Sequence, residues 1–297
     1  MEVKAYAKIN LCLDVLKRKD NGYHEVDMVM TNVNIFDVLE INERNDSKIL
    51  LSCDNQELAM DESNLIYKAI TLLQRESSKD FGIEIKLKKN IPMQAGMAGG
   101  SADAAATLRA VNGLLKLEIS ESRLLELGAK LGADVPFCIT GGTVLARGIG
   151  EKLVKLKDLP KLKLLIAKPK TGLSTKEVYE SLDIEGLNKS GFIHPSTENM
   201  VLIIESEGDD NTKIKGIANS LGNILELPAL RLLPEIEGIK RVMKDSNCLG
   251  CLMSGSGTSV FGIFENDEDI YRAADILKKN EGIDYINITH TIVSQED

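Results

Sequence analysis

The stretch that most constrains the chain is a cluster of glycines that runs directly into an alanine-rich segment. Residues 91–106 read Ile-Pro-Met-Gln-Ala-Gly-Met-Ala-Gly-Gly-Ser-Ala-Asp-Ala-Ala-Ala. Apolar residues then recur at helical spacing, which predicts a helix with one buried stripe through Ala104, Leu108, Val111 and Leu115. Glycines before a helix let backbone N–H groups converge on an anion such as phosphate. The stretch therefore predicts a phosphate site or, as the plain alternative, a tight turn with Ser101 as the helix N-cap.

Two common nucleotide loops are excluded. No lysine follows the glycines as a P-loop requires, and the Rossmann glycine pattern is absent. The Ser101 hydroxyl could cap the helix, bind a phosphate oxygen or touch a metal ion. Asp103, in the first turn of the predicted helix, favours the helix dipole but opposes a neighbouring polyphosphate. A bound Mg²⁺ or a sideways orientation of Asp103 would reconcile the two, and both remain open.

Charge and composition exclude several classes of partner. The 297 residues include 36 Lys and Arg against 45 Asp and Glu, a formal net charge of −9, so no global field attracts nucleic acid or an anionic membrane. Charged residues near the start and the lack of a long apolar run predict no signal peptide and no membrane span, hence a cytoplasmic protein. Five scattered cysteines fit reduced thiols, and Cys248 and Cys251 are interpreted as a buried pair on a strand.

Periodic patterns predict an α+β protein. From Val3 to Val15 the apolar residues fall on odd positions, which predicts a half-buried strand with Lys8 and Asn10 on the face away from the core. Asn21-Gly22 then predicts a turn, and a second strand pattern covers residues 33–41.

The second half of the chain is typical of an α+β layer of the split βαβ kind. A polar stretch that ends at Pro160 predicts a boundary between domains 1–157 and 158–297. Residues 188–211 are polar and weakly patterned, which predicts a long surface insertion. The other predicted elements are helix 64–73, strand 82–88, strand 162–167 followed by mixed helices to about residue 245, strand 248–253, strand 260–264, helix 267–279 and strand 285–293.

Three further features have an ordinary and a functional interpretation. Ser254-Gly-Ser-Gly257 is either a simple turn between strands or a loop that presses backbone donors against a ligand. Asp134 is either a helix cap or a carboxylate whose pKa responds to desolvation and to a nearby cation. Lys8 is by default a strand lysine that extends to solvent.

The order of these motifs resembles the GHMP kinase superfamily over nearly the whole chain. Residues 92–101 resemble its phosphate loop, and residues 253–257 resemble its C-terminal motif. Five blocks carry a closer resemblance to the branch that phosphorylates a cytidine diphosphate derivative of methylerythritol: 7–11 with 22–25, 95–105, 131–137, 148–151 and 174–179.

The resemblance implies a two-domain GHMP kinase fold, in which an N-terminal α/β domain carries the glycine-rich phosphate loop and the C-terminal domain is a ferredoxin-like layer. It also implies transfer of the γ-phosphoryl group of ATP to the 2-hydroxyl of the methylerythritol part of the substrate, in the non-mevalonate route to isoprenoid precursors. The implied cofactors are ATP and Mg²⁺, the implied partner is a small molecule with a cytidine diphosphate group, and the protein would be a monomer or homodimer.

The resemblance also implies roles for individual residues. Asp134 would be the base near the acceptor hydroxyl, and Lys8 would keep Asp134 ionised and offset negative charge during transfer. Tyr23 and Tyr179 would stack on the cytosine ring, while His24 would hydrogen-bond its edge. The implied substrate-binding set is Asn10, Tyr23, His24, Asp134, Thr175 and Tyr179, and the implied ATP-binding set is Pro92, Gly96, Met97, Ala98, Gly99, Gly100 and Ser101.

Departures from the usual loop leave alternatives open. Met97, Ala98 and Ala102 stand where the family usually has Leu, Gly and a second Ser. If position 98 requires a positive φ, its methyl group costs energy, whereas ordinary dihedrals would carry no cost. The alternatives are a kinase for another small alcohol, such as mevalonate or homoserine, and a nucleotide-binding relative without catalysis.

Overall fold

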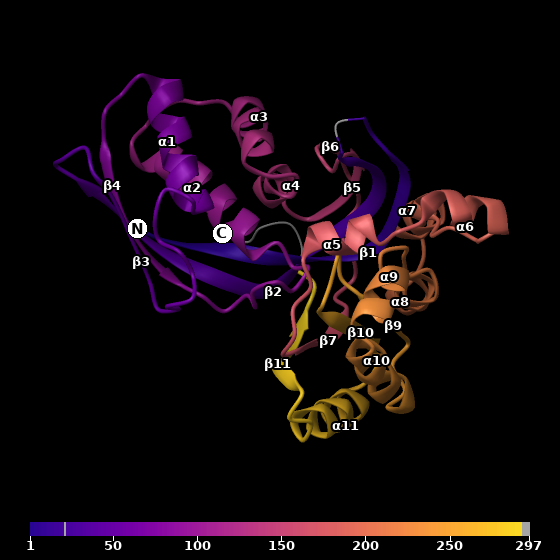
Figure 1. Ribbon diagram of the computed structural model, residues 1–297. Coiled ribbons are helices and arrows are strands. Elements are labelled where there is room, and N and C mark those ends of the chain that lie inside the picture. Colours follow the sequence, from indigo (N-terminus) through magenta and orange to yellow (C-terminus); the bar gives the residue numbers. More distant parts are fainter. Residues whose placement is uncertain (21, 293–297) are drawn as a thin grey trace. The chain divides into compact units, whose positions relative to one another are not determined.

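The computed structural model describes residues 1–20 and 22–292 (Figure 1). The predicted Asn21-Gly22 turn and the expected strand end at Val293 therefore fall partly outside the described residues. The chain forms two compact units that interleave along the sequence, unlike a single boundary at 157/158. The first contains Met1–Ala7, Ile35–Pro92 and Ala98–Gly141, and the second contains Lys8–Asn34, Met93–Met97 and the chain from Gly142. The long strands β1 (Glu2–Arg18) and β2 (His24–Arg44) contribute residues to both.

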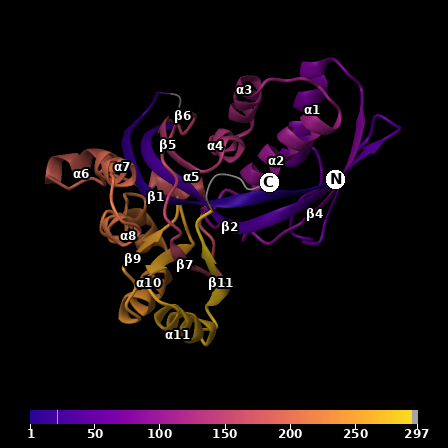
Figure 2. The same ribbon diagram turned by 180° about the vertical axis from the view of Figure 1, so that it is seen from behind.

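The first unit places helices beside a small set of strands. Within it, β4 (Gly82–Lys88) pairs antiparallel with Val38–Arg44 of β2 and parallel with β3 (Ile49–Cys53). Figures 1 and 2 show its helices grouped together, with α2 among the others. The helices are α1 (Leu65–Ser77), α2 (Gly99–Leu114), α3 (Glu121–Leu131) and α4 (Val135–Thr140). The predicted stripe of α2 is confirmed at Ala104, Leu108 and Val111, which are buried, whereas Leu115 follows the helix and is half-buried.

In the second unit, the middle of β1 is buried on both faces, so the expected half-buried strand is wrong there. The odd side chains Ile9 and Leu11 are fully buried as predicted. Lys8 and Asn10 on the other face are also only 3% and 0% exposed. Gly255 covers them, because a β-carbon at this glycine would stand 3.1 Å from Lys8 Nζ and 3.4 Å from Asn10 Oδ1.

The second unit contains the expected ferredoxin-like layer. Its strands are β7 (Lys163–Pro169), β9 (Gly250–Met253), β10 (Val260–Phe264) and β11 (Ile283–His290). They form an antiparallel sheet in the order β11-β7-β10-β9, which is the split βαβ arrangement. Helices α10 (Glu235–Asp245) and α11 (Asp267–Lys278) pack on this sheet (Figure 2). The sheet carries the Ser254–Gly257 loop between β9 and β10.

Further strands of the second unit pair with the later part of β1 and the beginning of β2. Strand β5 (Thr143–Gly148) pairs with Val26–Thr31 of β2 and with β6 (Lys152–Lys155). The short strand β8 (Gly222–Asn223) pairs parallel with Cys12 and Leu13. The remaining helices are α5 (Thr175–Glu180), α6 (Ile184–Ser190), α7 (Thr197–Glu205), α8 (Asp210–Asn219) and α9 (Glu226–Leu232).

Two sequence predictions in this unit need correction. The 188–211 segment is mostly helical rather than an unpatterned insertion, since side chains of Ser196 and Asp209 cap α7 and α8. These helices are short, so their caps identify them better than their periodicity does. Cys248 precedes β9 and Cys251 lies in it, and both are only partly buried because they lie near the edge of the sheet.

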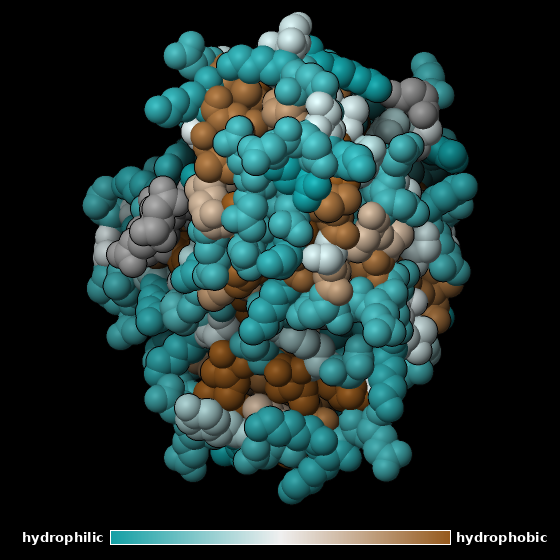
Figure 3. Space-filling view, turned by 90° about the vertical axis from the view of Figure 1, so that its left-hand side faces the viewer, coloured by the Kyte–Doolittle hydropathy of each residue, from teal (hydrophilic) through white to brown (hydrophobic). Residues whose placement is uncertain are grey.

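The surface is largely polar. Hydrophilic residues cover most of the face drawn in Figure 3, and hydrophobic residues appear as smaller groups, with one band toward its lower end. The exposed large hydrophobic side chains are scattered along the sequence and include Leu50, Leu202 and Ile276. No helix among the described residues has the length and apolar character needed to cross a membrane.

Candidate active site

The N-terminus of α2 has no side-chain cap. Ala98 precedes the helix with φ 60° and ψ 29°, and no side chain caps the first turn. The alternative with Ser101 as N-cap is therefore wrong, because Ser101 lies inside the first turn. The leading N–H groups of a helix have no intrahelical partner, and together with the helix dipole they favour negative charge. This is the arrangement that a phosphate-binding loop requires.

The backbone of Ala98, at the position where the family usually has glycine, adopts a positive φ. Its φ of 60° places it in the left-handed region, where a β-carbon crowds the backbone. The position therefore needs a positive φ, and the alanine carries the energetic cost. The methyl group does not prevent the turn.

In the second unit, the C-terminal loop packs tightly on the first bend of the glycine stretch. Gly96 has φ 68°, and a β-carbon there would stand 1.9 Å from the carbonyl oxygen of Ser254. The Ser254 hydroxyl donates to the Gly96 carbonyl at 2.9 Å. Only glycine fits this approach, so residues 254–257 are more than a simple turn between strands: they pack against Gly96. Their contact with a ligand stays a prediction.

Lys8 also contacts the glycine stretch. Its ammonium group donates to the Gly96 carbonyl at 3.0 Å and to Asn10 Oδ1 at 2.6 Å. The Lys8 backbone N–H donates to the Met97 carbonyl at 3.2 Å. These bonds hold a buried cation beside the backbone of residues 96 and 97, so the default interpretation of Lys8 as a solvent-extended lysine is wrong.

Asn223 and Glu226, to which the sequence patterns assign no role, hold the C-terminal loop. The Asn223 amide donates to the carbonyls of Met253 and Gly255, each at 2.8 Å, and Glu226 Oε1 accepts the Met253 N–H at 3.0 Å. Lys240 pairs with the other Glu226 oxygen at 2.5 Å. A side-chain amide can donate two hydrogen bonds and accept others. Asn223 can therefore bind the carbonyls of both Met253 and Gly255 while its oxygen remains available as an acceptor.

In the first unit, Asp134 and Ser101 come from neighbouring helices. Asp134 occupies the N-cap position of α4, but its side chain makes no capping bond to the helix. Helix capping therefore does not explain why an aspartate stands at this position. Gly132 lies close to the first turn of α2, because a β-carbon there would stand 3.8 Å from Ser101 Oγ. The turn that carries Asp134 is thus packed beside the start of α2.

The residues predicted to bind a base are partly brought together in the second unit. The His24 and Tyr179 rings lie 4.9 Å apart with an interplanar angle of 34°. Thr175 shares a hydrogen bond of 2.8 Å with Ser256 of the C-terminal loop. Burial, with a smaller effect of the Arg18 charge, lowers the pKa of His24, which favours the neutral imidazole. Tyr23 is 58% exposed.

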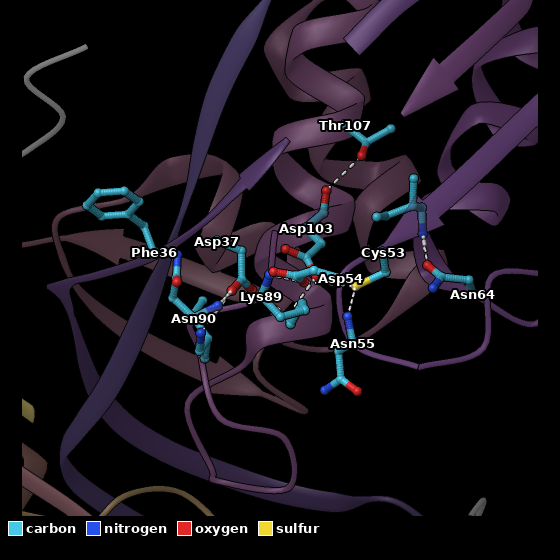
Figure 4. A network of polar contacts seen from close by, with 12 residues as sticks. Phe36, Asp37, Cys53, Asp54, Asn55, Asn64, Lys89, Asn90, Asp103 and Thr107 are labelled. Carbon is cyan, nitrogen blue, oxygen red and sulfur yellow. Dashed lines mark hydrogen bonds and ion pairs between the residues drawn. The ribbon is translucent and has the colours of Figure 1, made fainter. Parts of the chain in front are cut away.

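Asp103 points into the interior of the first unit, which resolves its conflict with a polyphosphate. Figure 4 shows its carboxylate beside Lys89 and Asp37. Lys89 Nζ donates to Asp103 Oδ2 at 2.9 Å and to Asp37 over a very short contact. Burial raises the pKa of Asp103 to about 7, although the Lys89 charge opposes this rise. Of the two explanations left open by the sequence, the sideways orientation is the one observed.

A metal site made of protein side chains alone does not occur in the described part of the chain. No group of three or more His, Cys, Asp or Glu side chains there could hold an ion. Mg²⁺ in phosphoryl-transfer enzymes is bound mostly by substrate phosphates and water, with one or two protein ligands. The donor set therefore fits an ion that arrives with a nucleotide better than a resident one.

Sequence comparison identifies the class of protein. Residues 64–142 match the family described as GHMP kinases N terminal domain, and residues 202–283 match GHMP kinases C terminal. The fold agrees, since the crystal structure of the Methanococcus jannaschii mevalonate kinase superposes with a TM-score of 0.74 at 15% identity over 98% of both chains.

More similar relatives narrow the class. Proteins named 4-diphosphocytidyl-2-C-methyl-D-erythritol kinase are 45% identical in Caldicellulosiruptor saccharolyticus, over 94% of this chain and 93% of that one, and 42% identical in Clostridioides difficile, over 97% and 95%. A crystal structure of 4-(cytidine 5'-diphospho)-2C-methyl-D-erythritol kinase superposes with a TM-score of 0.79 at 31% identity, over 98% of this chain and 100% of that one. The chain therefore belongs to the GHMP kinase family and, within it, to the group of proteins named 4-diphosphocytidyl-2-C-methyl-D-erythritol kinase.

Proposed function

We propose that the protein transfers the γ-phosphoryl group of ATP to the 2-hydroxyl of 4-diphosphocytidyl-2-C-methyl-D-erythritol, a step of non-mevalonate isoprenoid precursor synthesis. The observation that carries the proposal is the 45% identity, over 94% of the chain, to a relative with that name. The geometry supports it through the uncapped start of α2 and the buried cation at Lys8.

Positioning and charge stabilisation supply most of the catalysis of phosphoryl transfer. In the proposed mechanism, backbone N–H groups from Gly99 to Ser101 hold the ATP phosphates at the start of α2. Lys8 offsets negative charge on the transferred group, and Asp134 accepts the proton of the acceptor hydroxyl. Met97 is 1% exposed, so its contribution comes from its backbone rather than its side chain. Mg²⁺ that enters with ATP would neutralise phosphate charge.

The substrate end is proposed to involve the aromatic pair in the second unit. A cytosine ring would stack on Tyr179 and Tyr23, and neutral His24 would hydrogen-bond its edge while Asn10 orients the acceptor. Thr175, tied to the C-terminal loop, would contact the same substrate. We also propose that the protein is cytoplasmic, acts as a monomer or homodimer without nucleic acid or membrane, and carries its ATP loop and catalytic pair within residues 1–157.

A phosphoryl-transfer assay tests the proposal. With ATP and the cytidine-linked acceptor, ADP and phosphorylated acceptor should form in equal amounts, while methylerythritol without the nucleotide, mevalonate and homoserine should react far more slowly. Equal rates with cytidine-linked and plain methylerythritol would refute the nucleobase assignment, and faster turnover of mevalonate or homoserine would favour the alternative acceptors. Absence of ADP formation with every acceptor would refute the kinase assignment and favour a silent relative.

A further inference from the structure

Lys89 joins the two ends of the segment 92–101 from inside the first unit. It directly follows β4, and its ammonium group contacts Asp37 on β2 and Asp103, which comes just after the first turn of α2. The Lys89 side chain is 7% exposed, and the carboxylates of Asp37 and Asp103 are 0% and 3% exposed. A buried cation between two buried carboxylates is held in one place, since none of the three can turn to water.

The chain before the loop depends on the same cluster. Asp37 Oδ1 accepts the backbone N–H groups of Asn90 at 2.6 Å and Ile91 at 2.8 Å, directly before Pro92. The Lys89 N–H in turn donates to Asp54 Oδ1 at 3.0 Å (Figure 4). These bonds fix the backbone that leads into the loop.

The chain after the loop is held by the other carboxylate. Asp103 Oδ2 accepts from Lys89, while Asp103 Oδ1 is buried without a hydrogen-bond partner among the described residues. Gly99 lies close to the same cation, because a β-carbon at Gly99 would stand 3.3 Å from Lys89 Nζ and 3.1 Å from the Ile91 side chain. Without Lys89, Asp103 would have to take up a proton or turn outward, toward the proposed phosphates.

From this geometry we propose that Lys89 is a positioning residue for the ATP-binding loop: it keeps the Asp103 carboxylate turned away from the phosphates. The Lys89 side chain is buried and acts through Asp103, not by direct contact with the nucleotide. This inference rests on the proposed ATP-dependent function.

The test compares the nucleotide affinities of five proteins by calorimetry. These are the wild type, Lys89→Met, Asp103→Asn and the double variant, with Lys88→Met as the matched control from the exposed neighbouring lysine. Lys89→Met should raise the Kd and KM for ATP by roughly 10–100-fold, as expected for one elementary charge lost near a phosphate, while kcat changes much less. Adenosine has no phosphate, so its Kd should stay within about twofold.

Removal of the Asp103 carboxyl from the Lys89→Met variant should restore ATP affinity. In the double variant, ATP affinity should return to within about fivefold of the wild type, because no unpaired Asp103 carboxylate remains to face the phosphates. Asp103→Asn alone should bind ATP at least as tightly as the wild type, and this arm keeps the test valid if Lys89→Met does not fold.

Four outcomes would overturn the inference. These are unchanged ATP affinity in Lys89→Met, equal losses for ATP and adenosine, no recovery in the double variant, and weaker ATP binding in Asp103→Asn. Wild-type protein that binds no ATP would instead overturn the proposed function, and this inference with it.

Discussion

The ammonium nitrogen of Lys8 lies 3.0 Å from the carbonyl oxygen of Gly96, at the first bend of the glycine stretch. Asn10 Oδ1 accepts a second bond from the same nitrogen at 2.6 Å. Two fixed acceptors and a side chain that is almost fully buried leave this cation little freedom. A positive charge is thereby fixed beside Gly96, which agrees with the proposed role of Lys8 in offsetting negative charge on a transferred phosphoryl group.

Asp134→Asn should leave the fold and ATP affinity intact while it lowers kcat by roughly 10²–10⁴, the usual contribution of a positioned base. The amide has nearly the same shape but cannot accept the acceptor proton. Steady-state kinetics and calorimetry with ATP measure the two effects. Asp275→Asn, at a carboxylate 70% exposed on α11, should behave as the wild type. Near-normal turnover of Asp134→Asn would remove Asp134 from the mechanism.

Tyr179→Ala should raise the KM for the cytidine-linked acceptor by roughly 5–100-fold, because stacking of a base on an aromatic ring contributes about 1–3 kcal/mol. The KM for ATP should not change. Tyr179→Phe retains the ring beside His24 and should stay close to the wild type, as should Tyr271→Ala, whose ring is 57% exposed. An equal rise in KM for ATP and acceptor would show a general structural role instead.

Ala98→Gly should raise the free energy of unfolding by about 1 kcal/mol. Its φ of 60° is unfavourable for a residue with a β-carbon, and glycine removes most of this cost at a smaller loss in backbone entropy. Urea unfolding gives the measurement. Ala106→Gly, in the interior of α2, is the matched control and should destabilise by about 1 kcal/mol. Destabilisation by both variants would contradict the strain at position 98.

Asp103→Asn should change how stability depends on pH. The folded-state pKa of Asp103 is raised from 3.8 to about 7, so between these values the folded protein retains a proton that the unfolded chain has released. The proton therefore adds to the free energy of unfolding, and this contribution is fully present below about pH 4 and is lost as the pH rises through 7. It amounts to at most about 4 kcal/mol.

Urea unfolding at several pH values measures this effect. The stability of Asp103→Asn relative to the wild type should increase steadily from pH 4 to pH 8. Asp275→Asn, which removes an exposed carboxyl, should show the same dependence of unfolding free energy on pH as the wild type. A constant difference between Asp103→Asn and the wild type would show that the Asp103 carboxyl does not titrate in this range.

Local patterns in the sequence predict much of the fold correctly. The stripe of α2, strand β4 and the strands and helix of the ferredoxin-like layer follow from apolar periodicity, which depends only on neighbouring residues. Residues 188–211, predicted as a weakly patterned surface insertion, are mostly helical. Their helices are short, so caps indicate them better than periodicity does. Burial of both faces of β1 was missed because the covering residue, Gly255, lies far along the chain.

Some residues of the candidate site can be predicted from the sequence, whereas others are found only in the structure. The glycine stretch, Lys8 and Asp134 can be identified from order and residue type, since their motifs are local and resemble a known superfamily. The partners of Asp103 and the hold of Asn223 on the C-terminal loop depend on long-range contacts, and no local pattern reports which buried polar groups meet.

The amino-acid order alone was sufficient to specify the element types, the turn before α2 and the residue types available for phosphoryl transfer, because propensity and periodicity act over a few residues. Folding in three dimensions determined that Lys8 is a buried cation bonded to the Gly96 carbonyl and that Asp103 faces Lys89 and not the start of its helix. The physical reason is desolvation: a charge removed from water must find a partner, and that partner comes from whichever distant segment the packing brings beside it.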